Sequence, residues 1–336
     1  MAVLFFGQHP AAQSLTFALF ERYLGALREQ AGIPGLAAAI VQDGNIAWSR
    51  TFGVANVATQ AQLSENTPFP VSDLTETIAA ALVLRTCIET GEAELDDILE
   101  RWSPGFADRT ATFRQVLSHS GAGGYGFNRA RFRALTAAVE ECTDRPYAVT
   151  MVSEILDRFA MQSAVPGGDV IVSGSAVRQV LPTPKLNAYR ETLRQMATPH
   201  RVDNNRRATA VENYTAPTLT ADNGLVASIR DLAQFDAALD AGAIVRRGML
   251  EGTAWSRQGD SKMGLGWFVQ DVGNNRVVWH FGEEPGAYSS LLIKVPRHRV
   301  TLILLANSDG LSASLPLKNG DVTVSPFAQI FFTLLG

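Results

Sequence analysis

The amino-acid sequence predicts an α/β (α+β) sandwich, with a mainly antiparallel sheet built from both ends of the chain, flanking helices and an inserted helical subdomain. Two groups of β-like segments predict the sheet, one within residues 36–56 and one within residues 263–308. Helical patterns dominate the residues between them. We therefore expect residues 1–336 to form a single domain, with a sheet part at 1–72 and about 251–336 and a mainly helical part at about 73–250. The cleft should lie where these two parts meet.

The first third of the chain predicts a helix followed by a β-hairpin. Within residues 14–30, apolar side chains recur at the spacing of one helix face. They are Leu15, Leu19, Phe20, Tyr23, Leu24 and Leu27. After a break at Gly32-Ile-Pro-Gly35, two β-like runs are joined at Asp43-Gly44, a dipeptide that is typical of tight hairpins.

The last third of the chain predicts four strands and a closing helix. The strand segments are rich in β-branched and aromatic residues. They are MGLGWFVQD, NRVVWHFG, YSSLLIKVP and HRVTLILLANS. A final apolar segment, SPFAQIFFTLL, is expected to form a helix that begins at Ser325-Pro326.

Charge and hydropathy exclude several classes of protein. The chain has 29 basic and 33 acidic side chains, a net charge of −4, so it lacks the basic character of a nucleic-acid-binding protein. The apolar run Ala2–Phe6 is too short for a secretory signal, and no window approaches the roughly 20 apolar residues of a membrane helix. These features predict a cytoplasmic protein with neither a nucleic-acid nor a membrane partner.

The two cysteines predict neither a disulfide framework nor a zinc site. Cys87 lies in an apolar stretch and is expected to be a small core residue. Neither Cys87 nor Cys142 has a histidine at the spacing of zinc ligands.

A series of short segments, in a fixed order, carries a resemblance to a known superfamily. The segments are Pro34–Gly44, Phe52–Ala55, Phe69–Thr77, Leu117–Gly121, Asn223–Leu232, Gly264–Trp267 and Leu305–Ser308. In their order and spacing they resemble the serine β-lactamase and penicillin-binding-protein superfamily, and within it the class C β-lactamase, D,D-peptidase and esterase branch. The resemblance covers about residues 33–310 and implies a β-lactamase-like fold.

The first catalytic motif of that superfamily, Ser-x-x-Lys, is lost. In the matching string, Asp73 occupies the nucleophile position and Glu76 the lysine position. The four lysines of the chain (Lys185, Lys262, Lys294 and Lys318) are each preceded, three residues earlier, by a residue other than serine. Ser72 lies one position from the nucleophile, a rotation of about 100° on a helix, so it cannot simply substitute.

The other two motifs are also altered. Tyr-x-Asn is replaced by Val172-Ser173-Gly174, and the third motif, Lys/His-Thr/Ser-Gly, stands as His280-Phe281-Gly282 without its hydroxyl. An active-site serine hydrolase needs a nucleophile and a base that takes its proton. Since neither is present at the matching positions, we do not expect this chain to have the β-lactamase, peptidase or esterase activity of the superfamily.

The replacement residues predict acid–base chemistry. Asp73 and Glu76, three residues apart near a helix start, share one face, and neighbouring carboxylates tend to split their pKa values. The resemblance places His280 on the adjacent strand facing them. We expect Asp73 to be the base, Glu76 its proton partner, and His280 a second acid or base or an orienting group.

Other interpretations of the same acids remain open. Asp-x-x-Glu at a helix start is also a capping-box pattern, in which both acids only satisfy backbone amides. Asp73 can also act as a covalent nucleophile. A divalent metal held by Asp73, Glu76, His280, Glu283 and Glu284 is a further alternative, although we predict no metal and no cofactor.

Several neighbouring residues are candidates for substrate binding. The resemblance implies that the backbone amides of Asp73 and Glu283 form an oxyanion hole. Aromatic side chains of the glycine-rich loop and of the third-motif turn are expected to line the cleft. The substrate-binding candidates are Tyr125, Phe127, Phe281, Glu283 and Tyr288. His119 is expected to be structural, and His9, His200 and His298 to lie on the surface or in loops.

The predicted function is that of a repurposed, non-hydrolytic enzyme that cyclises, isomerises, eliminates or dehydrates a small organic substrate, in the manner of a biosynthetic enzyme. One alternative is a catalytically inactive protein that binds a ligand or partner in the old cleft. Another is a residual hydrolase or esterase with an atypical nucleophile. The sequence leaves the oligomeric state open.

Overall fold

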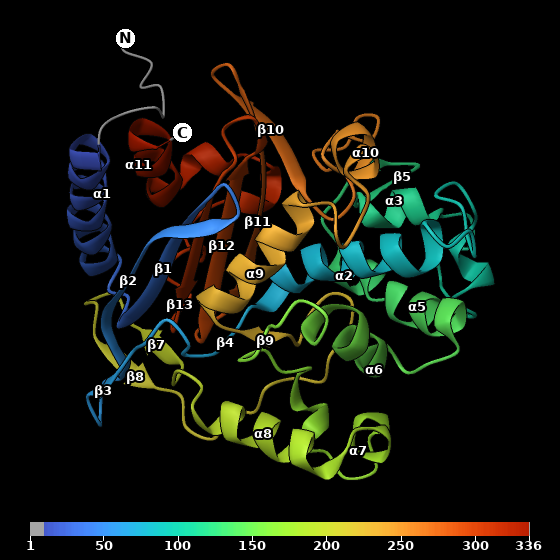
Figure 1. The fold of residues 1–336 in the computed structure, drawn as a ribbon, viewed down its shortest axis with the longest axis horizontal. Coiled ribbons are helices and arrows are strands. Elements are labelled where there is room, and N and C mark those ends of the chain that lie inside the picture. The colour runs from blue at the N-terminus through green and yellow to red at the C-terminus, as the bar shows by residue number, and fades with distance from the viewer. Residues whose placement is uncertain (1–9, 336) are drawn as a thin grey trace.

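The computed structural model describes residues 10–335, and Figure 1 shows a central sheet with helices on both of its faces. The apolar run Ala2–Phe6 and His9 lie outside the described residues. Within the described residues, every helix is too short or too polar to cross a membrane.

The central sheet joins strands from both ends of the chain, so the predicted fold class is confirmed. Its seven strands stand in the order β10-β11-β12-β13-β1-β2-β3, and all neighbours are antiparallel. The strands are β1 (Gly35–Gln42), β2 (Asn45–Asn56), β3 (Ala61–Gln62), β10 (Phe268–Val272), β11 (Asn275–Glu284), β12 (Tyr288–Val295) and β13 (Val300–Ala306). The pairing of β1 with β13 closes the sheet from the two chain ends, while the division of the domain into two parts stays a prediction.

The hairpin between β1 and β2 turns at Asp43-Gly44, as predicted. Both residues have positive φ, 52° and 76°, which is the backbone conformation of the hairpin turns that favour Asp-Gly.

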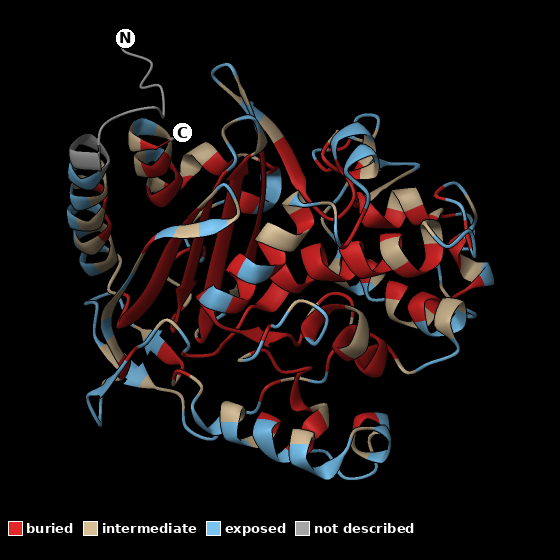
Figure 2. Ribbon diagram, viewed as in Figure 1, coloured by how far each residue is buried: buried red, intermediate tan, exposed pale blue. Residues whose placement is uncertain are grey.

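Alternate side chains of β1 enter two different cores, as the two-residue period of a strand requires. Ala37 and Ala39 pack in the core shared with α2 (Thr75–Val83) and α9 (Ile229–Asp240). Leu36 and Ile40 pack in the core on the other face, which includes side chains of α1 (Pro10–Gln30) and α11 (Pro326–Leu334). Figure 2 shows the sheet and α2 as the most continuously buried part of the fold.

The residues between β3 and β10 are mainly helical, as predicted. Their remaining helices are α3 (Phe113–Leu117), α4 (Arg129–Phe132), α5 (Leu135–Thr143), α6 (Tyr147–Met151), α7 (Ala176–Val180), α8 (Thr183–Arg194) and α10 (Arg247–Met249). Short strand pairs join them: β4 (Phe69–Pro70) with β9 (Val226–Ala227), β5 (Ser120–Gly121) with β6 (Gly124–Tyr125), and β7 (His200–Val202) with β8 (Ala208–Ala210). The expected loop at 200–223 thus contains a small hairpin.

The prediction for His200 is wrong. His200 is fully buried, and its Nε2 accepts a hydrogen bond from the Val57 amide at 3.3 Å. The short β7–β8 hairpin places it against β2 and β13, where its own amide donates to the Asn307 carbonyl at 2.8 Å.

The structure joins the two cysteines, which were not expected to form a disulfide framework. Cys87 is buried, as expected, but forms a disulfide with Cys142, with the two Cα atoms 5.4 Å apart. The bond ties the π-helical continuation of α2 (Leu84–Ile88) to α5. Disulfides are typical of oxidising compartments, and the cytoplasmic localisation stays a prediction.

Replacing both cysteines with alanine should lower the free energy of unfolding by about 2–4 kcal/mol, because the bond closes a long loop in the unfolded chain. The measurement is urea denaturation of the oxidised protein and of the Cys87→Ala/Cys142→Ala variant. A reductant should destabilise the natural protein and leave the variant unchanged. Two reactive thiols in the denatured, unreduced protein would contradict the disulfide.

Candidate active site

A strained turn presents Asp73 at the start of α2. A 3₁₀ turn, Ser72–Leu74, precedes the helix, and Ser72 has φ of 53°, in the left-handed region that serine seldom adopts. The Ser290 hydroxyl donates to the Val71 carbonyl at 2.8 Å. A Cβ on Gly282 would lie 2.1 Å from the same carbonyl oxygen, so the glycine of β11 lets the turn approach the sheet. Backbone strain of this kind costs roughly 1–3 kcal/mol and concentrates at functional sites.

Neither acid caps its own helix, so the capping interpretation is wrong. No side-chain cap hydrogen bond is present at the start of the Ser72–Leu74 turn or of α2. Instead, Asp73 Oδ2 accepts a hydrogen bond from the Glu283 amide at 3.1 Å, and Asp73 Oδ1 forms an ion pair with Arg129. Both acids therefore make their contacts with other parts of the fold.

Asp73 is a buried carboxyl that titrates near neutrality. Its side chain is only 1% exposed. Burial raises the pKa of Asp73 from 3.8 to about 7, because the Arg129 cation offsets only part of the loss of hydration, and the Glu76 charge raises the pKa further. A carboxyl with this pKa can both take and return a proton at neutral pH.

Glu76 lies between two imidazoles. Its Oε2 is 2.9 Å from His119 Nε2 and 3.3 Å from His280 Nε2, and all three side chains are buried. Burial alone would raise the pKa of Glu76, but the two imidazoles outweigh it, and the pKa of Glu76 is lowered. The two acids thus have pKa values shifted in opposite directions, the arrangement that separates an acid from a base.

The hydrogen bonds assign the ring nitrogens of both histidines. His119 Nδ1 accepts a hydrogen bond from the backbone amide of Asn128 at 2.8 Å. Its Nε2 therefore carries the proton that is donated to Glu76. The Phe281 carbonyl is an acceptor only, so His280 Nδ1 donates to it at 2.7 Å. His280 Nε2 is then the ring nitrogen that faces Glu76, 3.3 Å from its Oε2.

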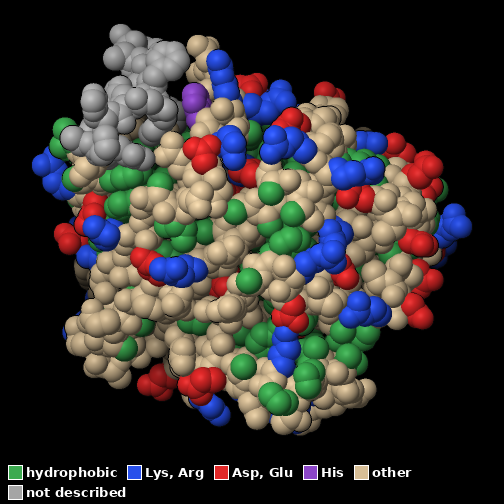
Figure 3. Space-filling view, in the orientation of Figure 1, with side chains coloured by type: hydrophobic (Ala, Val, Ile, Leu, Met, Phe, Trp, Pro, Cys, Tyr) green, Lys and Arg blue, Asp and Glu red, His purple; other side chains and the backbone are tan. Residues whose placement is uncertain are grey.

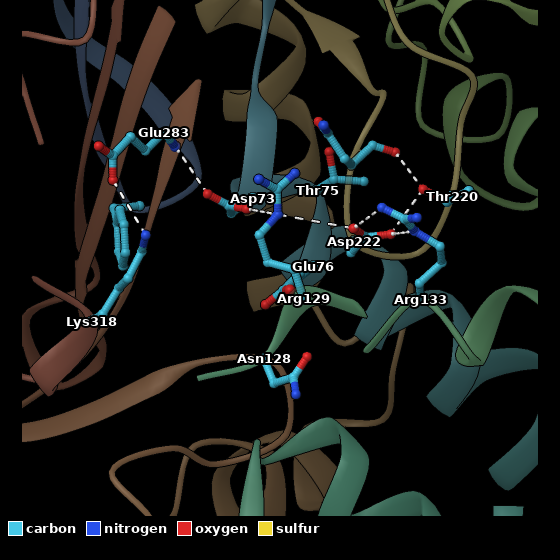
Figure 4. A network of polar contacts seen from close by, with 12 residues as sticks. Asp73, Thr75, Glu76, Asn128, Arg129, Arg133, Thr220, Asp222, Glu283 and Lys318 are labelled. Atoms are coloured by element: carbon cyan, nitrogen blue, oxygen red, sulfur yellow. Dashed lines mark hydrogen bonds and ion pairs between the residues drawn. The ribbon is translucent and has the colours of Figure 1, made fainter. Parts of the chain in front are cut away.

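Arg129 connects Asp73 to a second buried acid, Asp222, as Figure 4 shows. Arg129 Nε is 3.9 Å from Asp222 Oδ2. Asp222 is held by Arg133 through two hydrogen bonds of 2.9 and 3.0 Å, and it accepts a third from the Thr220 hydroxyl at 2.9 Å. Arg129 thus lies within ion-pair distance of two buried acids, Asp73 and Asp222.

The expected oxyanion hole is partly filled by the protein itself. The Glu283 amide, one of its two expected donors, already donates to Asp73. The Glu283 side chain lies 3.6 Å from Lys318 Nζ, at the edge of the site in Figure 4. A substrate oxygen can reach the Glu283 amide only after the Asp73 carboxyl has moved.

The aromatic candidates divide into two groups. Phe127 stacks on His119, with ring centroids 4.5 Å apart, and its ring is 5.8 Å from that of Phe281. Tyr125 donates its hydroxyl to the Lys318 carbonyl at 2.6 Å, beside the same site.

Phe281 and Tyr288 have buried rings, so neither offers exposed surface to a ligand. Tyr288 donates its hydroxyl to the Ala197 carbonyl at 2.6 Å and packs against Tyr214. Substrate binding by all five candidate residues stays a prediction.

Three residues of this site were not assigned to it from the sequence: His119, Arg129 and Asp222. His119 belongs to the Leu117–Gly121 segment, where its structural role was expected, but its contact with Glu76 was not. Arg129, at the start of α4, and Asp222, in a turn, come together only in the fold, and no local pattern marks either of them. Among residues 10–335, no group of three or more His, Cys, Asp or Glu side chains is arranged to hold a metal ion.

Comparison with known proteins identifies relatives of this fold. A family model described as "Beta-lactamase" matches residues 20–322. Esterase EstB of Burkholderia gladioli is 32% identical over 127 residues, which are 34% of this chain and 32% of the esterase. The match therefore spans about a third of that curated relative's length.

Solved structures resemble the chain over nearly its whole length. The octameric penicillin-binding protein homologue from Pyrococcus abyssi superimposes with a TM-score of 0.72 at 17% identity, covering 94% of this chain and 77% of that one. D-amino acid amidase from Ochrobactrum anthropi SV3 gives 0.71 at 16% identity, covering 94% and 99%. SurE gives 0.69 at 22% identity, covering 92% and 76%. At these identities, the likeness concerns the fold alone.

Proposed function

The chain belongs to the β-lactamase family, and we propose that it is a non-hydrolytic enzyme of this family that performs acid–base chemistry on a small organic substrate. The observation that carries the proposal is the Asp73 carboxyl, which stands at the position of the family's nucleophile and has a pKa raised by burial to about 7. Perturbed carboxyls of this kind are typical of catalytic acids and bases. Cyclisation, isomerisation, elimination and dehydration all require such a proton transfer.

In the proposed mechanism, ionised Asp73 takes a proton from the substrate, and protonated Asp73 returns it. Glu76 stays ionised between His119 and His280 and fixes the orientation of both rings. His280 Nε2, paired with Glu76, supplies the second proton-transfer group. Each well-placed group of this type contributes about 10²–10⁴-fold to the rate.

Hydrolysis is the activity that the names of the relatives suggest, since they include an esterase and an amidase. Ser72, the serine next to the nucleophile position, does not support hydrolysis. Ser72 Oγ is buried and makes no hydrogen bond, so no base is placed to take its proton.

An inactive binding protein is the second candidate function. It is favoured by the contacts of Asp73, which already occupies both the Glu283 amide and the Arg129 guanidinium. In that case the site would hold a ligand without transferring a proton.

The test uses proton exchange, because it does not require the substrate to be known in advance. The protein is incubated in D₂O with a pool of small metabolites, and mass spectrometry detects compounds that gain deuterium. The proposal predicts enzyme-dependent incorporation, and its absence would favour the binding protein. The same protein, treated with a fluorophosphonate, should stay unlabelled by intact mass; labelling that disappears in Ser72→Ala would support a serine hydrolase instead.

A further inference from the structure

The charges around Asp73 are arranged with the acids inside and the cations outside. The side chains of Asp73 and Asp222 are at most 1% exposed. Arg129, Arg133 and Lys318, which pair with acids of the same network, are 33%, 58% and 55% exposed. A small molecule that approaches the site therefore meets guanidinium and ammonium groups before it meets a carboxylate.

Of the two arginines, Arg129 has the more replaceable partner. Arg133 holds Asp222 through two hydrogen bonds, whereas Arg129 is shared between Asp73 and a more distant contact of 3.9 Å with Asp222. With a pKa of about 7, Asp73 is protonated for a large part of the time at neutral pH. A carboxylate that stays fully ionised at that pH is a better partner for the guanidinium than Asp73 is.

Arg129 is also held next to the proton-transfer groups by its own backbone. It is the first residue of α4, directly after Asn128, whose amide donates to His119 Nδ1 at 2.8 Å. His119 in turn contacts Glu76. A ligand group bound by Arg129 is therefore fixed relative to both acids of the site.

We propose that the substrate carries a carboxylate and that Arg129 determines this specificity by exchanging Asp73 for the substrate's carboxylate. The planar guanidinium suits two-point binding of a carboxylate, which a lysine cannot reproduce. Once Arg129 turns to the substrate, Asp73 loses its cationic partner, which raises its pKa further and favours its protonated form, the form that returns a proton to the substrate. This inference rests on the proposed function, because it names the substrate class of the same site.

The experiment compares probes that share a skeleton and differ in charge. The probes are titrated into the protein by calorimetry. One set is phenylacetate, phenylacetamide and 2-phenylethylamine, and the other is hexanoate, hexanamide and hexylamine. The carboxylate of at least one set should bind at least about 10-fold more tightly than its amide and amine, as a charged hydrogen bond requires. Arg129→Gln should weaken that binding roughly 10–100-fold.

Two further variants test whether the binding depends on the guanidinium of Arg129. Arg129→Lys keeps the charge and should still lose most of the binding, because it cannot bind a carboxylate at two points. Arg109→Gln, at an exposed position outside the network, should bind as the natural protein does. Preference for an amine, equal binding by Arg129→Gln, or no carboxylate binding in either set would overturn the proposal.

The outcomes also separate this inference from the proposed function. Deuterium incorporation without a carboxylate preference removes the substrate class and leaves the acid–base function. Carboxylate binding without deuterium incorporation keeps the role of Arg129 in binding and removes the acid–base function.

Discussion

Replacing Asp73 with asparagine should reduce enzyme-dependent deuterium incorporation about 10²–10⁴-fold, the contribution of a general base. Asparagine keeps the size of the side chain and an oxygen for the Glu283 amide, but it cannot take a proton. In the natural protein the rate should rise as the pH increases through about 7, because only ionised Asp73 acts as the base. The measurement is the initial rate of incorporation across a pH series.

Asp96→Asn is the matched control, since it makes the same chemical change at an acid whose side chain is 70% exposed and outside the site. It should incorporate deuterium at the natural rate. An Asp73→Asn variant that is folded and retains the full rate would show that Asp73 is not the base.

The same Asp73→Asn substitution should stabilise the protein at pH 8. The pKa of Asp73 is raised in the folded state from 3.8 to about 7, so folding favours its protonated form. Between these values the unfolded chain has lost the proton and the folded protein keeps it. The contribution of Asp73 to stability therefore falls as the pH rises through this window, by roughly 4 kcal/mol in total.

Asparagine resembles the protonated carboxyl and has no charge to bury, so the variant avoids this loss. Urea denaturation at several pH values should show Asp73→Asn and the natural protein with similar stability near pH 4, and the variant more stable above pH 7. Asp96→Asn should show no such gain. If Asp73→Asn were less stable than the natural protein at pH 8, the Arg129 ion pair would be a net stabilising contact, and the raised pKa of Asp73 would be wrong.

The sheet could be predicted from the sequence because its signals are local. The Asp43-Gly44 turn, the β-branched runs of the last third and the Ser325-Pro326 helix start each depend on neighbouring residues, and all three form as predicted. The Cys87–Cys142 bond could not be predicted in this way. It depends on how α5 packs against the helix that continues α2, a contact between residues 55 positions apart.

The site was predictable only in part, because its contacts also join residues that are far apart in the sequence. The spacing of Asp73 and Glu76 fits both a capping box and a catalytic pair, since both need two acids on one face of a helix start. Tertiary contacts exclude the capping box, because Glu283 and Arg129 bind Asp73 and two histidines bind Glu76, while the catalytic role of both acids stays a prediction. Arg129, the first residue of the short helix α4, carries no local signal of its proximity to either acid.

Asp73 is proposed to be a proton-transfer group that titrates near neutrality, and a direct titration of its carboxyl tests this proposal. The protein is labelled with carbon-13 at the aspartate side-chain carboxyls, and the Asp73 resonance is identified by its loss in Asp73→Asn. The Asp73 resonance should titrate with a midpoint at about pH 7. A midpoint near pH 4, the ordinary value for an aspartate, would contradict it.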